Sequence, residues 1–81
     1  MPVVFRYKGY RFFFFSNEGD PREPMHIHVR KGEATAKFWI NPFVAIAEAY
    51  RLDAAELRDL AKVAEENRGR IERSWNEHFP E

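Results

Sequence analysis

Two Lys-Gly dipeptides, at residues 8–9 and 31–32, most constrain how this chain can fold. Each separates two short stretches rich in aromatic and aliphatic residues, which cover residues 3–7 and 10–15 in the first case and 25–30 and 33–40 in the second. Glycine readily adopts the positive φ that a two-residue hairpin turn requires. The sequence therefore predicts two β-hairpins within residues 1–40, with each Lys-Gly pair as the turn.

The second half of the chain predicts a helix. Asp53 and Glu56 have the spacing of a capping box at a helix start. Apolar residues recur at helical spacing from Leu57 to Phe79, and Pro80 follows. We expect one long helix over residues 52–79, continuous or bent near residues 67–69, because a straight helix of that length would measure about 40 Å. Residues 41–51 are compatible with a fifth strand, a turn or a short helix.

These elements predict an α+β fold. An antiparallel sheet of two hairpins, with four to five strands, would carry the long C-terminal helix on one face. The 81 residues of the chain are expected to form a single domain, residues 1–81. Cysteine is absent, which excludes disulfides and thiolate metal sites. No apolar run is long enough to span a membrane and no signal-peptide pattern is present, so we expect a soluble cytoplasmic protein.

One face of the second predicted hairpin is polar. Two-residue turns determine the register of a hairpin, and hence which side chains lie opposite each other. With residues 31–32 as the turn, the polar residues form the cross-strand pairs Arg30–Glu33, His28–Thr35 and His26–Lys37. The other face of this hairpin is apolar and is predicted to face the core.

The first hairpin extends this polar face. There Arg6 is predicted to lie opposite Arg11, on the same face as Phe13 and Phe15. The candidate phosphate or nucleic-acid contacts are Arg6, Arg11, Arg30 and Lys37, and the candidate stacking or interface residues are Phe13, Phe15 and Trp39. Cations beside exposed rings on a sheet are typical of single-stranded nucleic-acid binding. Alternatively, residues 43–50 or a partner chain cover Phe13 and Phe15.

Charge is distributed unevenly along the chain. Residues 1–40 hold seven basic and four acidic residues, and residues 41–81 hold six and nine. A basic first half indicates an anionic partner, or an attraction between the two halves.

The His26-x-His28 pair allows three interpretations. Alternate strand residues point to the same side, so both imidazoles could bind zinc or another divalent metal, with His78 as a third ligand. As a second interpretation, His26 and His28 are the acid and base of a metal-independent RNA cleavage. The third interpretation is structural, with both rings hydrogen-bonded within the hairpin or to the loop at residues 18–23. The sequence leaves open whether the protein is an enzyme.

Several segments resemble a known bacterial family. They are Val4-Phe5-Arg6-Tyr7 with Gly9 and Phe12-Phe13-Phe14, then Glu23-Pro24-Met25-His26-Ile27-His28-Val29, Ala36-Lys37-Phe38-Trp39 and Trp75-Asn76-Glu77-His78-Phe79. Together they resemble the domain-of-unknown-function 4160 family over nearly the whole chain, although Met25 stands where the family pattern has a second proline. The resemblance implies no catalytic or metal-binding role for any residue. It does imply a small protein partner resembling the domain-of-unknown-function 2442 family, in an arrangement similar to toxin–antitoxin operons.

From these observations we expect a toxin–antitoxin-type protein that binds a cognate partner and contacts or cleaves RNA through its polar sheet face. No cofactor is expected in this interpretation. One alternative is a non-enzymatic interaction module that forms homodimers or hetero-oligomers through Phe13, Phe15 and Trp39. Another is a metal-binding domain that uses His26, His28 and His78.

Overall fold

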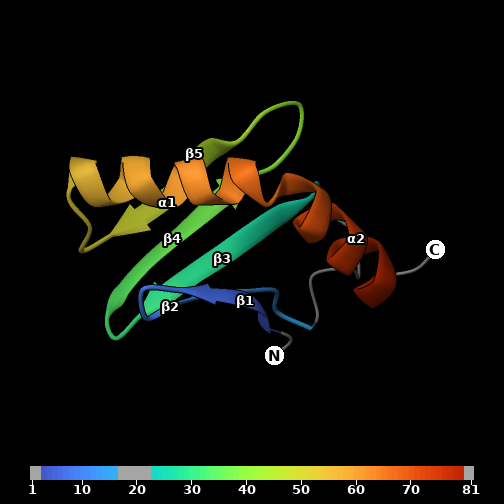
Figure 1. Ribbon diagram of the computed structural model, residues 1–81, viewed down its shortest axis with the longest axis horizontal. Coiled ribbons are helices and arrows are strands. Elements are labelled where there is room, and N and C mark those ends of the chain that lie inside the picture. Colours follow the sequence, from blue (N-terminus) through green and yellow to red (C-terminus); the bar gives the residue numbers. More distant parts are fainter. Residues whose placement is uncertain (1–2, 17–22, 80–81) are drawn as a thin grey trace.

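The five strands form one antiparallel sheet. The structure is a computed structural model, and it describes residues 3–16 and 23–79 of the chain. The strands are β1 (Val3–Tyr7), β2 (Tyr10–Phe13), β3 (His26–Lys31), β4 (Ala34–Trp39) and β5 (Ala45–Tyr50). They lie side by side in the order in which they occur in the chain, and each is antiparallel to its neighbour (Figure 1). Residues 41–51, for which the sequence left alternatives open, thus contribute the fifth strand.

The turn of the first hairpin lies at Lys8 and Gly9, as predicted. Both residues have positive φ angles, of 48° and 84°, which is the pattern of a type I′ turn. The turn places Arg6 opposite Arg11, in the predicted register.

The predicted turn of the second hairpin is wrong by one residue. The turn residues are Gly32 and Glu33, and Lys31 instead pairs with Ala34. Of the two turn residues only Gly32 has a positive φ, of 60°, which suits a type II′ turn. In this turn Lys31 does not have to adopt a positive φ. The cross-strand pairs therefore move by two residues and become Arg30–Thr35, His28–Lys37 and His26–Trp39. A shift of two leaves every side chain on its predicted face.

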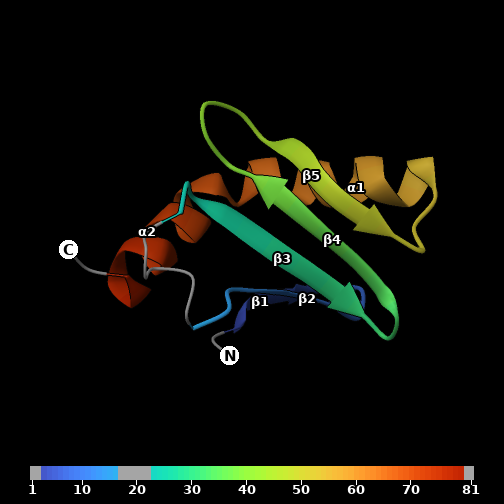
Figure 2. The ribbon, with the colours of Figure 1, turned by 180° about the vertical axis from the view of Figure 1, so that it is seen from behind.

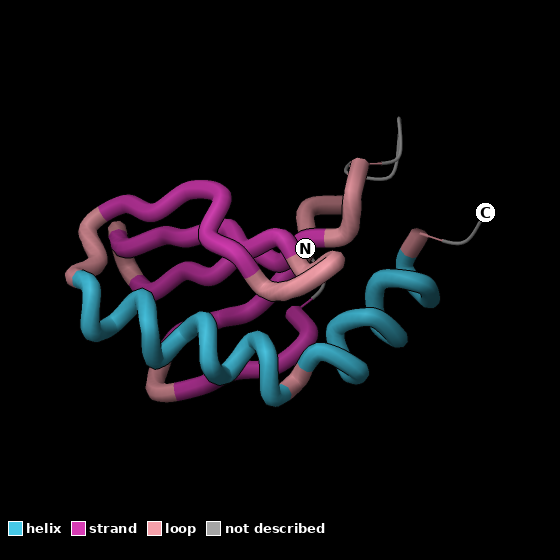
Figure 3. The backbone as a smooth tube through the Cα atoms, turned by 90° about the horizontal axis from the view of Figure 1, so that it is seen from above, coloured by secondary structure: helices cyan, strands magenta, loops and turns pink. Residues whose placement is uncertain are grey.

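The prediction of one long helix, continuous or bent near residues 67–69, is confirmed in part: the segment is helical, but Asn67 divides it into two helices. Helix α1 (Ala54–Glu66) and helix α2 (Arg68–His78) meet at this residue, whose φ and ψ are −107° and 18°. The Asn67 side chain donates a hydrogen bond of 2.9 Å to the Val63 carbonyl, competing with the regular helical pattern. As a result α2 turns away from the axis of α1 (Figure 3). The bend lies in the predicted region, but at the asparagine, while Gly69 is inside α2.

The predicted capping box is present at the start of α1. The Glu56 amide donates to the Asp53 carboxylate at 2.7 Å, and the Asp53 amide donates to the Glu56 carboxylate at 3.0 Å. Each side chain thereby satisfies a backbone donor that the first helical turn leaves unpaired.

Helix α1 covers one face of the sheet and the core lies between them. The core includes Phe12, Phe14, Ile27, Val29, Phe38, Leu60, Ala64, Ile71 and Trp75, all buried. Two tyrosine hydroxyls also attach the sheet to α1, because Tyr7 donates to Asp59 at 2.9 Å and Tyr10 donates to Glu56 at 3.1 Å. Burial and the hydrogen bond to Glu56 raise the pKa of Tyr10, which keeps its hydroxyl protonated as a donor.

Neither helix of the described chain is long and apolar enough to cross a membrane.

Candidate functional site

We call the face of the sheet opposite α1 the outer face (Figure 2). The register places the predicted site residues of the strands on this face, whereas His78 lies on α2. The side chains of the outer face form rows across the strands because the register aligns them. One row runs from Arg6 on β1 through Arg11 on β2 to Arg30 on β3. We call these three residues the arginine row, and Thr35 and Tyr50 continue it onto β4 and β5.

Among the residues that the structure describes, none neutralises the arginine row. No carboxylate in residues 3–16 or 23–79 forms an ion pair with any of the three guanidinium groups, and within these residues Arg30 donates only to the Gly32 carbonyl, at 3.0 Å. Like charges directly opposite each other destabilise a sheet. This arrangement therefore favours an anion that binds across the row and relieves the repulsion.

Phe13, Phe15 and His28 form an aromatic cluster in the next row. The Phe13 ring stacks on His28 with a centroid distance of 5.6 Å, and the Phe15 ring meets the same imidazole edge-on at 4.6 Å. Phe13 is buried, whereas Phe15 remains 40% exposed. The rings of Phe15, just after β2, and of His28 on β3 thus contact Phe13, so residues 43–50 are not needed to explain its burial.

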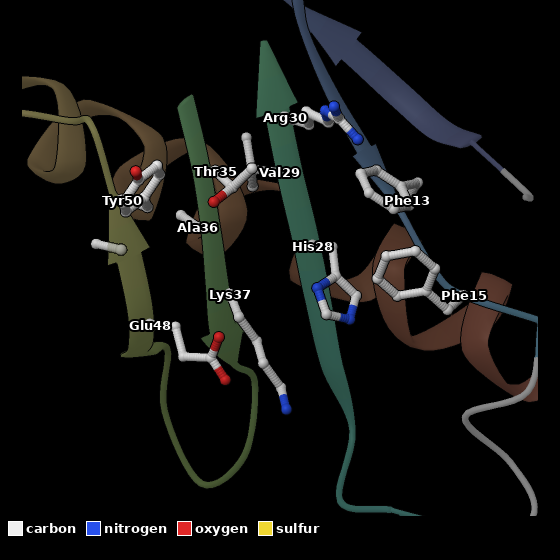
Figure 4. Close-up of a pocket in the computed structure, with 11 residues that line it drawn as sticks. Phe13, Phe15, His28, Val29, Arg30, Thr35, Ala36, Lys37, Glu48 and Tyr50 are labelled. Carbon is white, nitrogen blue, oxygen red and sulfur yellow. The ribbon is translucent and has the colours of Figure 1, made fainter. Parts of the chain in front are cut away.

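A groove of about 690 Å³ separates the aromatic cluster from β5. Figure 4 shows Phe13, Phe15 and His28 on one side, with Tyr50 and Glu48 on the other. Val29, Thr35 and Ala36 lie between these two walls, and Arg30 lies at one end. The groove therefore combines exposed ring surface with cationic and hydrogen-bonding groups.

Lys37 borders the groove, but its charge is already partly compensated. Its Nζ lies 3.8 Å from a Glu23 carboxylate oxygen and 4.5 Å from the centre of the Trp39 ring. The side chain is only 15% exposed. The structure therefore places Lys37 at the site as a cation that is less available to a ligand than the arginine row. Trp39 lies half-buried beneath it and lines no part of the groove.

His26 is fully buried and does not line the groove. Its Nδ1 donates to the Pro24 carbonyl at 2.8 Å, which assigns the proton to that nitrogen. Its ring centroid lies 5.1 Å from that of Trp75 on α2 and 5.1 Å from that of His28. The two histidines are thus neighbours, but only His28 borders the groove.

His78 lies at the end of α2, against the rings of Phe14 and Phe79. Its Nε2 is buried and has no hydrogen-bond partner among the described residues. Within that part of the chain, no three or more His, Cys, Asp or Glu residues are grouped so that they could hold a metal ion. The structure therefore does not bring His26, His28 and His78 together.

Comparison with known families agrees with the resemblance found in the sequence. The family model described as "Domain of unknown function (DUF4160)" matches residues 9–76. The chain belongs to the DUF4160 family. No curated protein and no solved structure matches the chain. For this DUF4160 protein, function must be argued from the geometry of the outer face.

Sequence reasoning missed the groove residues that β5 contributes in this DUF4160 protein, of which Glu48 and Tyr50 carry polar groups. Both lie on β5, a segment for which the sequence did not distinguish a strand from a turn or helix. A strand would place residues 48 and 50 on one face, opposite Lys37 and Thr35. The alternation could have found them, but only once the segment was known to pair with β4.

Proposed function

We propose that the outer face binds single-stranded RNA. The observation that carries this proposal is the register, which aligns the arginine row, without an ion pair to any described residue, beside an aromatic cluster on one open face. Single-stranded nucleic-acid sites combine a cationic track for the phosphates with rings on which the bases stack.

The arginine row suits a phosphate backbone. Neighbouring strands lie about 4.8 Å apart, so the three arginines cover roughly 10 Å across the sheet. Planar guanidinium groups bind phosphate through two parallel hydrogen bonds, which a lysine cannot reproduce. The row therefore provides neighbouring positions for the phosphates of one strand.

The aromatic cluster suits an unstacked base. Phe15 presents the exposed ring of the cluster, and the Phe13–His28 stack supports it from below. A duplex keeps its bases stacked on one another, so a ring on the protein can stack only on bases of a single strand. Thr35 between the two walls, and Glu48 and Tyr50 on the wall opposite the cluster, offer polar groups that can hydrogen-bond to a ribose 2′-hydroxyl. This feature favours RNA over DNA.

The arrangement supports binding better than cleavage by two histidines. Acid–base cleavage requires both catalytic groups to reach the substrate. His28 borders the groove, whereas His26 is buried behind it. Our proposal is therefore an RNA-binding protein with His28 as a contact residue. An RNA-binding protein of this kind fits a role in a toxin–antitoxin-type module. The cognate protein partner in such a module stays a prediction.

Fluorescence anisotropy with a short labelled single-stranded RNA at low salt tests this proposal. The wild type should bind, and a duplex of the same sequence should bind more weakly. The Phe15→Ala variant should lose affinity by roughly 5- to 150-fold, because a stacked base contributes about 1–3 kcal/mol.

Phe43→Ala is the matched control, since Phe43 is 65% exposed but does not line the groove. It should bind RNA as the wild type does. Equal losses in the two variants, or no binding by the wild type, would refute the proposal.

A further inference from the structure

The edge of β5 that does not pair with β4 is open and apolar. β5 is the last strand of the sheet, so within the described chain only one of its edges is paired. Among the described residues, five large apolar side chains are exposed, and three of them, Phe43, Ile46 and Tyr50, lie in β5 or just before it. Unpaired edges are templates for another strand, and many proteins protect them with lysine or proline. β5 contains neither residue.

The charges near this edge favour a second copy of the chain as its partner. β5 carries the acidic Glu48 and is followed by the basic Arg51, so the edge has no excess of one sign. The whole chain has a formal net charge of +0, which removes the long-range repulsion between identical molecules. The opposite edge, β1, carries Arg6 and is followed by Lys8, so two copies would repel each other there.

The register of such a pair follows from the irregularity in β5. A bulge places Ile46 opposite Phe38 and Glu48 opposite Lys37, which leaves residues 48–50 as the regular part of the strand. A two-fold axis at Ala49 pairs Glu48 of each copy with Tyr50 of the other. Both side chains lie on the outer face, where the tyrosine hydroxyl can donate to the carboxylate. A two-fold axis at Glu48 would instead oppose two carboxylates, which is unfavourable.

We propose that two copies of this protein pair through antiparallel β5 strands, with Ala49 on the two-fold axis. Such an axis stands perpendicular to the sheet, so the outer faces of both copies point to the same side. Glu48 and Tyr50 line the groove at this edge, so the two grooves meet there. The pairing is independent of RNA. Only the further consequence, a continuous RNA-binding surface across both copies, depends on the proposed function.

The absence of cysteine from the chain allows a direct test by crosslinking. In the Ala49→Cys variant the two introduced residues lie directly opposite each other, with Cα atoms about 4.5–5.5 Å apart. This separation is within the range of a disulfide. Mild oxidation of the purified variant, without RNA, should convert most of it to a covalent dimer.

Ala55→Cys provides the matched control, because Ala55 is also exposed but lies on α1. This variant should remain largely monomeric under the same oxidation. Sedimentation equilibrium of the wild type should show a reversible dimer whose fraction rises with protein concentration. A wild type that stays monomeric, or an Ala49→Cys variant that crosslinks no faster than the control, would overturn the proposal. Because no RNA is present, either result leaves the RNA-binding proposal to its own test.

Discussion

The Trp75→Ala variant is expected to lose about 3–5 kcal/mol of unfolding free energy, the usual cost of removing a buried tryptophan side chain. Trp75 is 1% exposed, and its ring contacts Phe14 at 5.2 Å, His26 at 5.1 Å and Phe79 at 4.5 Å between centroids. It thereby joins α2 to β3 and to the end of β2. A domain of this size has a total stability of roughly 4–12 kcal/mol. The loss should therefore leave a marginally folded protein, measurable by urea denaturation.

Phe43→Ala serves as the control for this experiment. Phe43 is also aromatic, but it is 65% exposed, so its removal should change the unfolding free energy by less than about 0.5 kcal/mol. If Trp75→Ala were no more destabilising than Phe43→Ala, the result would contradict the packing of α2 against the sheet through Trp75.

Reversing two charges of the arginine row should nearly abolish RNA binding. In the Arg11→Glu/Arg30→Glu variant, two cations that we place on phosphates become anions, so attraction is replaced by repulsion. We expect affinity at low salt to fall by roughly 100-fold or more. The slope of log K against log salt should decrease by about 1.4, because two phosphate contacts on a single strand are lost. Anisotropy titrations over a range of salt concentrations measure both quantities.

This double variant keeps the fold comparable with the wild type. Arg11 and Arg30 are cross-strand neighbours, so the reversal exchanges one like-charged pair for another. Arg58→Glu/Lys62→Glu on the exposed surface of α1 is the matched control, with the same change in net charge. It should retain most of the affinity. If both variants lost affinity equally, binding would reflect overall charge and not the outer face.

The two faces of the sheet and the pairing of the first hairpin could be predicted from the sequence, but the cross-strand pairs of the second hairpin could not. Alternation of polar and apolar residues assigns His28, Arg30 and Lys37 to one face whatever the turn. Which turn forms depends on whether Gly32 is the first or the second of the two turn residues, and glycine suits both positions. The choice between them moved each pair by two residues and placed His28, and not His26, beside Lys37. The candidate residues of the second hairpin were therefore correctly assigned to a face but incorrectly paired.

Burial of His26 depends on tertiary structure that the local sequence does not encode. The residue alternates with His28 along β3, so the strand pattern treats the two as equivalent. They differ because α2 turns at Asn67 and brings Trp75 against one of them. The sequence pattern did predict a bend near residue 67, but not the direction in which the second helix would leave. Which histidine borders the groove therefore became clear only from the structure.

The most direct test of RNA binding by the outer face is a residue-resolved NMR titration of the wild type with a short single-stranded RNA. We expect the largest shift changes at the amides of Phe15, His28 and Arg30, with little change along the exposed surface of α1. These changes should diminish as salt is added, because counterions compete for the phosphates. Changes confined to the helices, or no change at any RNA concentration, would contradict RNA binding by the outer face.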